Sequence, residues 1–190
     1  TQLIEPYVST RANPLTDGFC LQGMKRVSRS LRRACQEGED PAAREDMAAA
    51  ALLSGLALAN AGLGVVHGFA GPIGGMFPAP HGAVCAALLP GGMETNIQAL
   101  HERAPHSEAL RRYGEIGRVL TGRPDARAED GVAWVKQVCR DLVIPPLRSH
   151  GIGEADFPLL VARASQASSM KANPIVLTAE ELRAVLDSAL

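Results

Sequence analysis

The chain has 190 residues, enough for one sizeable domain whose core closes without disulfide or metal. With 46% hydrophobic residues, 21% charged residues and a net charge of −1, it lacks the global charge that draws proteins to nucleic acid or anionic membranes. The four cysteines show neither CxxC spacing nor the density of a disulfide framework. We therefore expect a reduced, cytoplasmic protein.

Helical patterns fill the chain and strand patterns are nearly absent, with only 4% aromatic residues. Asn13 and Asp40 each precede a proline, and Thr178 is followed three residues later by Glu181, all of which are helix start signals. The sequence predicts an all-α helical bundle domain. Its expected helices, in chain order, are 2–10, 15–35, 41–66, 82–104, 107–120, 128–142, 154–169 and 179–188.

The basic run KRVSRSLRR at 25–33 places several cations along one helical face. No interleaved aromatic residues and no second basic segment accompany it, so a solvated helix face is favoured over a phosphate-binding surface. We expect no nucleic-acid partner.

A long charge-free stretch follows, with no Asp, Glu, Lys or Arg between Asp46 and Glu94. Its first part, 47–66, is long enough to span a bilayer, and a membrane bundle is one alternative. Against that alternative, this part is built on Ala and Gly and ends in a Pro/Gly/His segment that lipid could not solvate. Because small residues allow close helix contacts, we expect no membrane partner and a buried helix over 41–66 at the centre of the bundle.

Two histidines lie in the charge-free stretch, fourteen residues apart and separated by helix-breaking glycines and prolines. His67 is expected at the end of the apolar helix, and His81 follows Pro80 at the start of the next one. A tight connection could bring both rings to one metal ion, since imidazole is the commonest transition-metal ligand in proteins. From the residues alone, separate structural roles for the two histidines stay open.

Residues 59–90, ANAGLGVVHGFAGPIGGMFPAPHGAVCAALLP, resemble the signature of the iron-containing (group III) alcohol dehydrogenase family. That family pairs a histidine in GLGxxH with a second one in PHG. Residues 1–17 and 168–186 are similar to the start and end of its helical half. The resemblance implies that 1–190 form the C-terminal helical metal-binding domain of a dehydroquinate synthase-like architecture, and that an N-terminal dinucleotide-binding domain is absent from this chain.

The resemblance also implies a metal site. His67, His81 and Gln2 are the expected ligands of a divalent metal, Fe or Zn, although Gln2 stands where members commonly have a histidine. The family's aspartate would lie upstream of Thr1. Gly71 occupies the position of a histidine thought to relay protons. The expected walls of the substrate pocket are Phe69, Gly71, Met76 and Phe77.

The function implied by the resemblance is that of the metal-holding half of an alcohol or aldehyde oxidoreductase. Hydride would pass between a small alcohol or carbonyl substrate and NAD or NADP, which the absent domain would bind. We expect the isolated chain to be inactive and the full-length protein to be a homo-oligomer. The alternative, favoured by Gln2 and Gly71, is a non-catalytic helical domain that kept the fold and lost the metal.

Overall fold

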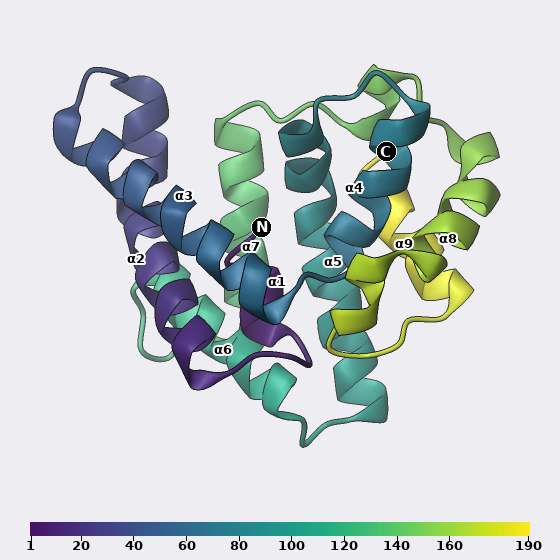
Figure 1. Ribbon diagram of the computed structural model, residues 1–190, viewed down its shortest axis with the longest axis horizontal. Helices are drawn as coiled ribbons and strands as arrows, with labels where there is room; N and C mark the ends of the chain where they lie inside the picture. Colours follow the sequence, from purple (N-terminus) through teal and green to yellow (C-terminus); the bar gives the residue numbers. More distant parts are fainter.

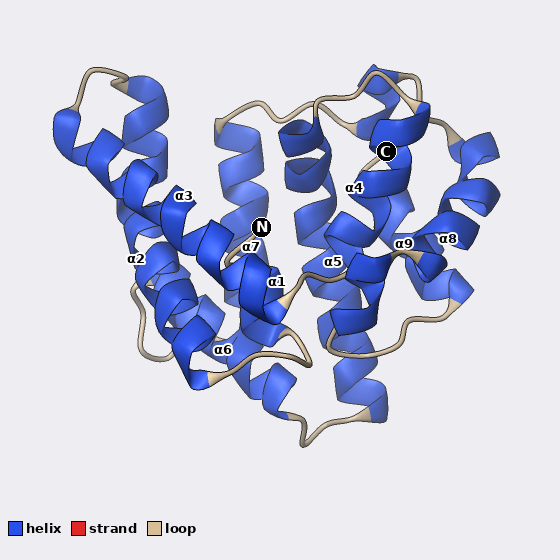
Figure 2. Ribbon diagram, in the orientation of Figure 1, coloured by secondary structure: helices blue, strands red, loops and turns tan.

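The computed structural model describes residues 1–190, and all of its regular elements are helices joined by loops (Figure 1, Figure 2). The predicted all-α class is confirmed. The α-helices are α1 (Ile4–Val8), α2 (Pro14–Gln36), α3 (Pro41–Ala61), α4 (Val65–Met76), α5 (His81–Arg103), α6 (Glu108–Thr121), α7 (Ala128–Asp141), α8 (Phe157–Gln166) and α9 (Ala179–Asp187). Short 3-10 helices cover Leu147–His150, Glu154–Asp156 and Ser168–Ala172.

The predicted start signals act as helix caps. The Asn13 side chain accepts hydrogen bonds from free amides at the start of α2, and the Asp40 carboxylate does the same for α3. Thr178 and Glu181 form a capping box at the start of α9. These local contacts explain why the starts of α2, α3 and α9 agree with the sequence prediction.

The helix predicted over 41–66 is in fact two helices. α3 ends at Ala61, where Gly62 adopts a left-handed φ of 72°, and α4 begins at Val65. The two helix axes differ in direction by 98°. No single helix of the structure is long and apolar enough to cross a membrane, and only this bent pair reaches the required length and composition together.

The Gly- and Pro-rich segment after Val66 was expected to break the helix, and that expectation was wrong. It forms α4, with Pro72 inside the helix. Phe69 and Ile73, on the inner face of α4, have no exposed surface. Burying side chains of this size stabilises the fold by about 1.5–3 kcal/mol each, so packing offsets the low helix propensity of the segment.

The centre of the bundle is α5, not the predicted 41–66 segment. α5 contacts α4, α6, α7 and α9, and it carries the buried side chains Leu88, Met93 and Leu100. α3 instead pairs with α2 at the left of Figure 1. Its outer side chains Leu52 and Leu56 are 66% and 40% exposed. The small residues of α3 pack on one side only, so the helix lies at the edge of the domain.

The basic run on α2 lies on a solvent-exposed face and forms ion pairs there. Arg26 and Arg29 contact the carboxylate of Asp46 on α3 at 2.7 and 2.6 Å, and Arg32 contacts Asp141 of α7 at 2.6 Å. The hydrogen bond from Arg29 is the largest cause that holds the pKa of Asp46 well below its usual range. The run therefore joins α2 to α3 and α7.

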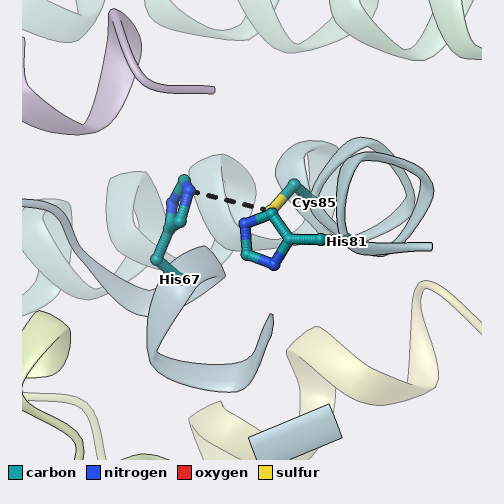
Figure 3. A group of neighbouring side chains, drawn as sticks. All are labelled: His67, His81 and Cys85. Atoms are coloured by element: carbon teal, nitrogen blue, oxygen red, sulfur yellow. Dashed lines mark hydrogen bonds between the residues drawn. The ribbon is translucent and has the colours of Figure 1, made fainter. Parts of the chain in front are cut away.

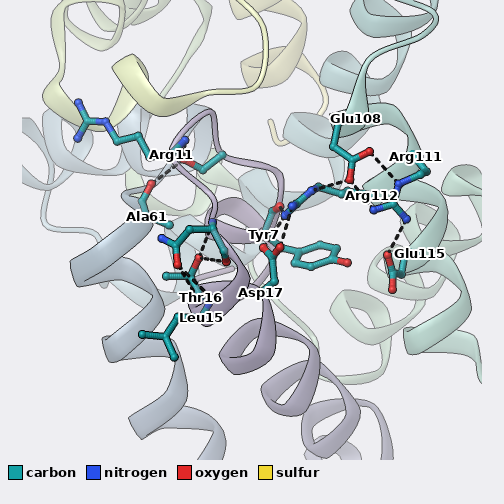
Figure 4. Close-up of polar contacts among 12 residues, drawn as sticks. Tyr7, Arg11, Leu15, Thr16, Asp17, Ala61, Glu108, Arg111, Arg112 and Glu115 are labelled. Atoms are coloured by element: carbon teal, nitrogen blue, oxygen red, sulfur yellow. Dashed lines mark hydrogen bonds and ion pairs between the residues drawn. The ribbon is translucent and has the colours of Figure 1, made fainter.

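The short helix α1 is fixed by an arginine of α6. Arg112 donates to the carbonyl oxygen of Tyr7 at 2.7 Å and to both carboxylate oxygens of Asp17 at 2.5 and 2.7 Å (Figure 4). Its guanidinium also lies 5.0 Å from the centroid of the Tyr7 ring. A five-residue helix has little stability of its own, so these contacts hold the segment that carries Gln2 and Glu5.

Gly117 tests the close packing of α6 on α7. A Cβ atom there would lie 2.1 Å from the carbonyl oxygen of Arg127, so we expect Gly117→Ala to lower the free energy of unfolding by about 1–3 kcal/mol. Gly114 is the matched control on the same helix, because its Cβ would meet only the end of Arg118 at 3.6 Å. Gly114→Ala should be neutral or stabilising by up to about 1 kcal/mol. Equal urea midpoints for the two variants would contradict this packing.

Candidate functional site

His67 lies in the first turn of α4, as its third residue. The sequence placed His67 at the end of the preceding helix. That placement was wrong because the helix is interrupted at 62–64 and a new helix begins at Val65. The consequence is electrostatic, since the N-terminus of a helix carries partial positive charge where its C-terminus carries negative charge. Negative groups near His67 are therefore stabilised by the partial positive charge at the start of α4, as well as by a protonated imidazole ring.

Two distant side chains cap the start of α4. The Val65 amide donates to Oδ1 of Asn173 at 3.0 Å, and the Val66 amide donates to Oε1 of Glu5 at 2.7 Å. The N-cap residue is Gly64, which has no side chain to offer. A Cβ on Gly64 would lie 2.7 Å from Asn173 Oδ1 and 3.1 Å from Glu5 Oε1. Glycine is required here so that both acceptors can approach the helix.

The second carboxylate oxygen of Glu5 binds His67. Oε2 lies 2.5 Å from Nδ1 of the ring, and both residues are buried, with 6% and 8% of their surface exposed. Because the carboxylate is the acceptor, Nδ1 carries the proton and Nε2 is the nitrogen left for another partner. A carboxylate behind a histidine in this way fixes the ring and increases its basicity as a ligand.

The electrostatics of His67 favour positive charge at the ring. Burial alone lowers its pKa, but the hydrogen bonds with Cys85 and Glu5 and the negative charge of Glu5 outweigh burial and raise the pKa of His67 to about 9. A metal ion at Nε2 would take the place of that proton. The negative charge of Glu5 favours either the proton or a metal ion at this nitrogen.

His81 is the first residue of α5, as the sequence predicted, and Cys85 lies one turn later on the same face. The rings of His67 and His81 have centroids 5.4 Å apart. The Cys85 Sγ is 3.8 Å from Nε2 of His67 and 3.5 Å from Nε2 of His81. The three potential ligand atoms all lie within 4.8 Å of one another. Figure 3 shows His67 facing the other two residues across the gap between α4 and α5.

Gln2 faces the same place from the turn that precedes α1. Its Oε1 accepts a hydrogen bond from the Ser54 hydroxyl of α3 at 3.1 Å. Gln2, His67 and His81 all line one cavity of about 360 Å³. Its other lining residues are Thr1, Leu3, Val27, Met47, Ala50, Ala51, Ser54, Gly82 and Cys85.

The four expected pocket walls do not line this cavity. Phe69 is a core residue with no exposed surface. Gly71 is exposed, with open space around its Cα, while Met76 and Phe77 pack half-buried against the core.

The sequence interpretation missed Glu5, Cys85 and Asn173. Glu5 and Cys85 each left a signal that was not used. Glu5 is the one charged residue in the IEPYV segment, and Cys85 follows His81 at the i, i+4 spacing that places two side chains on one helical face. Asn173 had no local signal, because its partners Val65 and Asn96 are 108 and 77 residues away.

Comparison with known proteins identifies the family. The sequence model described as Fe-containing alcohol dehydrogenase family, C-terminal, matches residues 1–190. The chain belongs to the iron-containing alcohol dehydrogenase family. It is 36% identical to 1,3-propanediol dehydrogenase of Klebsiella pneumoniae over 192 residues, covering 100% of this chain and 48% of that protein. It is 37% identical to alcohol dehydrogenase 4 of Schizosaccharomyces pombe over 191 residues, covering 100% of this chain and 43% of that protein.

Solved structures agree with this assignment. A crystal structure of 1,3-propanediol oxidoreductase superposes with a TM-score of 0.90 at 32% identity, covering 100% of this chain and 49% of that one. An alcohol dehydrogenase from Oenococcus oeni gives a TM-score of 0.87 at 34% identity, with 100% and 49% coverage. The chain spans about half the length of these iron-containing alcohol dehydrogenase relatives.

Membership of this family implies a metal and a nicotinamide cofactor. The residues around the cavity fit a divalent transition metal, because two imidazole nitrogens and one sulfur approach a common point with a buried carboxylate behind one of them. They offer no comparable fit to Mg²⁺ or Ca²⁺, which take oxygen ligands.

Asn173 provides a test of how α4 is positioned. Asn173→Ala would leave the buried Val65 amide and the Oδ1 atom of Asn96 without a partner, so we expect the free energy of unfolding to fall by about 1–3 kcal/mol. The control is Asn60→Ala, on the exposed side of α3, which should change it by no more than about 0.5 kcal/mol. Thermal or urea unfolding measures both, and equal effects would contradict a capping role for Asn173.

Proposed function

We propose that this chain is the metal-holding half of an oxidoreductase that transfers hydride between a nicotinamide cofactor and a small alcohol or aldehyde. The observation that carries the proposal is the approach of His67 and His81 from two different helices to one cavity. The named activities of its relatives, 1,3-propanediol dehydrogenase and alcohol dehydrogenase, support this substrate class.

In this proposal, His67 and His81 would hold a divalent Fe or Zn ion, and Gln2, which lines the same cavity, would offer an amide oxygen. A bound divalent metal supplies a Lewis acid that polarises the substrate oxygen and stabilises negative charge on it. Glu5 keeps the His67 ring oriented with Nε2 toward the cavity. The apolar wall formed by Leu3, Val27 and neighbouring residues limits the access of water to this point.

The remaining parts of the proposal concern the whole protein. NAD or NADP would be bound by a separate dinucleotide-binding domain preceding this one, and the complete enzyme would be a homo-oligomer. The four cysteines are free, which supports the expected cytoplasmic setting. The non-catalytic alternative has no support, because the relatives that match are dehydrogenases and a donor set remains at the site.

The activity can be tested in a chimera that joins the N-terminal half of Klebsiella pneumoniae 1,3-propanediol dehydrogenase to this chain. We expect NAD-dependent oxidation of small alcohols by the chimera and none by the 190-residue chain alone. Because the metal supplies several kcal/mol of transition-state stabilisation, His67→Ala and His81→Ala should each lower kcat/KM by at least about 100-fold.

The first control is the relative's own N- and C-terminal halves rejoined at the same point as in the chimera. The second is a measurement of the metal content of each sample. A chimera that binds both NAD and metal but turns over no alcohol would contradict the proposal. So would an active chimera whose rate is unchanged by His67→Ala, or turnover by the chain alone.

Glu5 gives a second test of the same site. In Glu5→Gln the amide oxygen can still accept from Val66, but the amide NH₂ would donate to His67 Nδ1 and move the ring proton to Nε2. We expect the affinity for Zn²⁺ to fall by about 10–100-fold, the usual cost of losing such a partner. Isothermal titration measures the affinity, and Glu94→Gln on the exposed side of α5 is the control. Equal Zn²⁺ affinities in the two variants would contradict the orienting role of Glu5.

A further inference from the structure

Cys85 is buried beside the two histidines, and the metal site proposed from the family resemblance makes no use of it. It is 5% exposed and lines the cavity, and its sulfur lies close to the rings of both His67 and His81 (Figure 3). The nitrogens nearest to it are Nε2 of both histidines. A cysteine that served only to fill the core would not need to meet two imidazoles at their available nitrogens.

We propose that Cys85 is the third protein ligand of this site, so that two histidines and one cysteine bind Zn²⁺ in preference to the iron after which the family is named. This inference rests on the proposed metal site and adds both a ligand and a choice of metal to it. On binding, the thiol releases its proton to solvent and the thiolate forms the sulfur–zinc bond, with no change of oxidation state.

The distances around Cys85 match a tetrahedral zinc ion. With Zn–S near 2.3 Å and Zn–N near 2.0–2.1 Å, a tetrahedral ion holds sulfur and nitrogen about 3.6 Å apart. The two separations in the structure are 3.5 and 3.8 Å. The two nitrogens lie within 4.8 Å of each other, against about 3.4 Å in a tetrahedral site. His81 is exposed at the start of α5, so its side chain is free to rotate and close that gap.

The helices hold the other two ligands in place. His67 is fixed by Glu5 at Nδ1, which directs Nε2 toward the sulfur. Cys85 is in the second turn of α5, four residues after His81, so one rigid helix presents both residues on one face. Ligands on packed helices keep their geometry better than ligands on loops.

The choice of zinc follows from the donor atoms. A thiolate is a soft ligand and favours Zn²⁺, whereas non-haem Fe²⁺ is typically bound by imidazole and carboxylate ligands. The thiolate also brings a negative charge that the neutral amide of Gln2 does not bring. Three protein ligands leave the fourth tetrahedral position open toward the cavity, which is the arrangement of catalytic zinc sites. Gln2, whose amide oxygen accepts a hydrogen bond from Ser54, lines the same cavity.

Cobalt substitution tests the proposal without reference to enzyme activity. The purified 190-residue chain, stripped of metal and kept reduced, is titrated with Co²⁺ and followed by absorption spectroscopy. We expect visible bands of a tetrahedral ion together with a near-ultraviolet charge-transfer band from thiolate to cobalt. One equivalent of Zn²⁺ should remove both, and Fe²⁺ added without oxygen should not.

Two variants assign the band to its ligand. Cys85→Ser should lose the charge-transfer band. It should also weaken Zn²⁺ binding more than Glu5→Gln does, for which we expect a loss of about 10–100-fold. Cys35→Ser, which changes an exposed cysteine on α2, should behave as the wild-type chain does. A further variant is His81→Ala. Because the side chain of His81 is exposed, the variant domain should still fold, but its affinity for Zn²⁺ should fall.

The outcomes separate this inference from the function on which it rests. Tetrahedral bands without a thiolate band in the wild-type chain, or a thiolate band that persists in Cys85→Ser, would overturn the role of Cys85 and leave the histidine site standing. Displacement of Co²⁺ by Fe²⁺ but not by Zn²⁺ would overturn the choice of metal. No binding of Co²⁺ or Zn²⁺ by the folded chain would overturn both the inference and the metal site itself.

Discussion

The buried carboxylate of Glu5 is the interaction on which the candidate site depends. One oxygen caps the Val66 amide at the start of α4, and the other binds Nδ1 of His67. A single side chain therefore fixes both where α4 begins and how its histidine is turned. Glu5 is itself held in place because Arg112 fixes the short helix α1 against α2 and α6. The partly buried contacts of Arg112 on α6 thus contribute indirectly to the geometry of a site at the opposite end of α1.

The charge-free stretch between Asp46 and Glu94 has a structural explanation in this fold. It contains most of α3, all of α4 and the first half of the central helix α5. The buried ring of His67 is poorly solvated in such surroundings, so the electrostatic effect of Glu5 on it is stronger than it would be in water. The same burial would make an unpaired charge costly, which is why a carboxylate and a histidine occur here together.

Gln2 and Cys85 change the character of the site relative to the pattern of the family. The neutral amide of Gln2 is already engaged by Ser54 and is a weak ligand. A thiolate at Cys85 would provide the negative charge and the strong bond that the amide lacks, from a position on α5 rather than on the first helix. The site could then keep its place in the fold while its donor atoms came from different elements.

The sequence by itself determined the all-α class, the helix starts at Asn13, Asp40 and Thr178, and the family, because caps and the histidine motif are local patterns. It also predicted that His67 and His81 would come together. Tertiary structure decided that 65–76 is a helix, that α5 is the central helix, and that Phe69 belongs to the core. It also brought Glu5 and Asn173 to the start of α4 from 61 and 108 residues away. Such contacts have no local signal, since burial against distant residues outweighs the weak helix propensity of glycine and proline and sets which side chains meet.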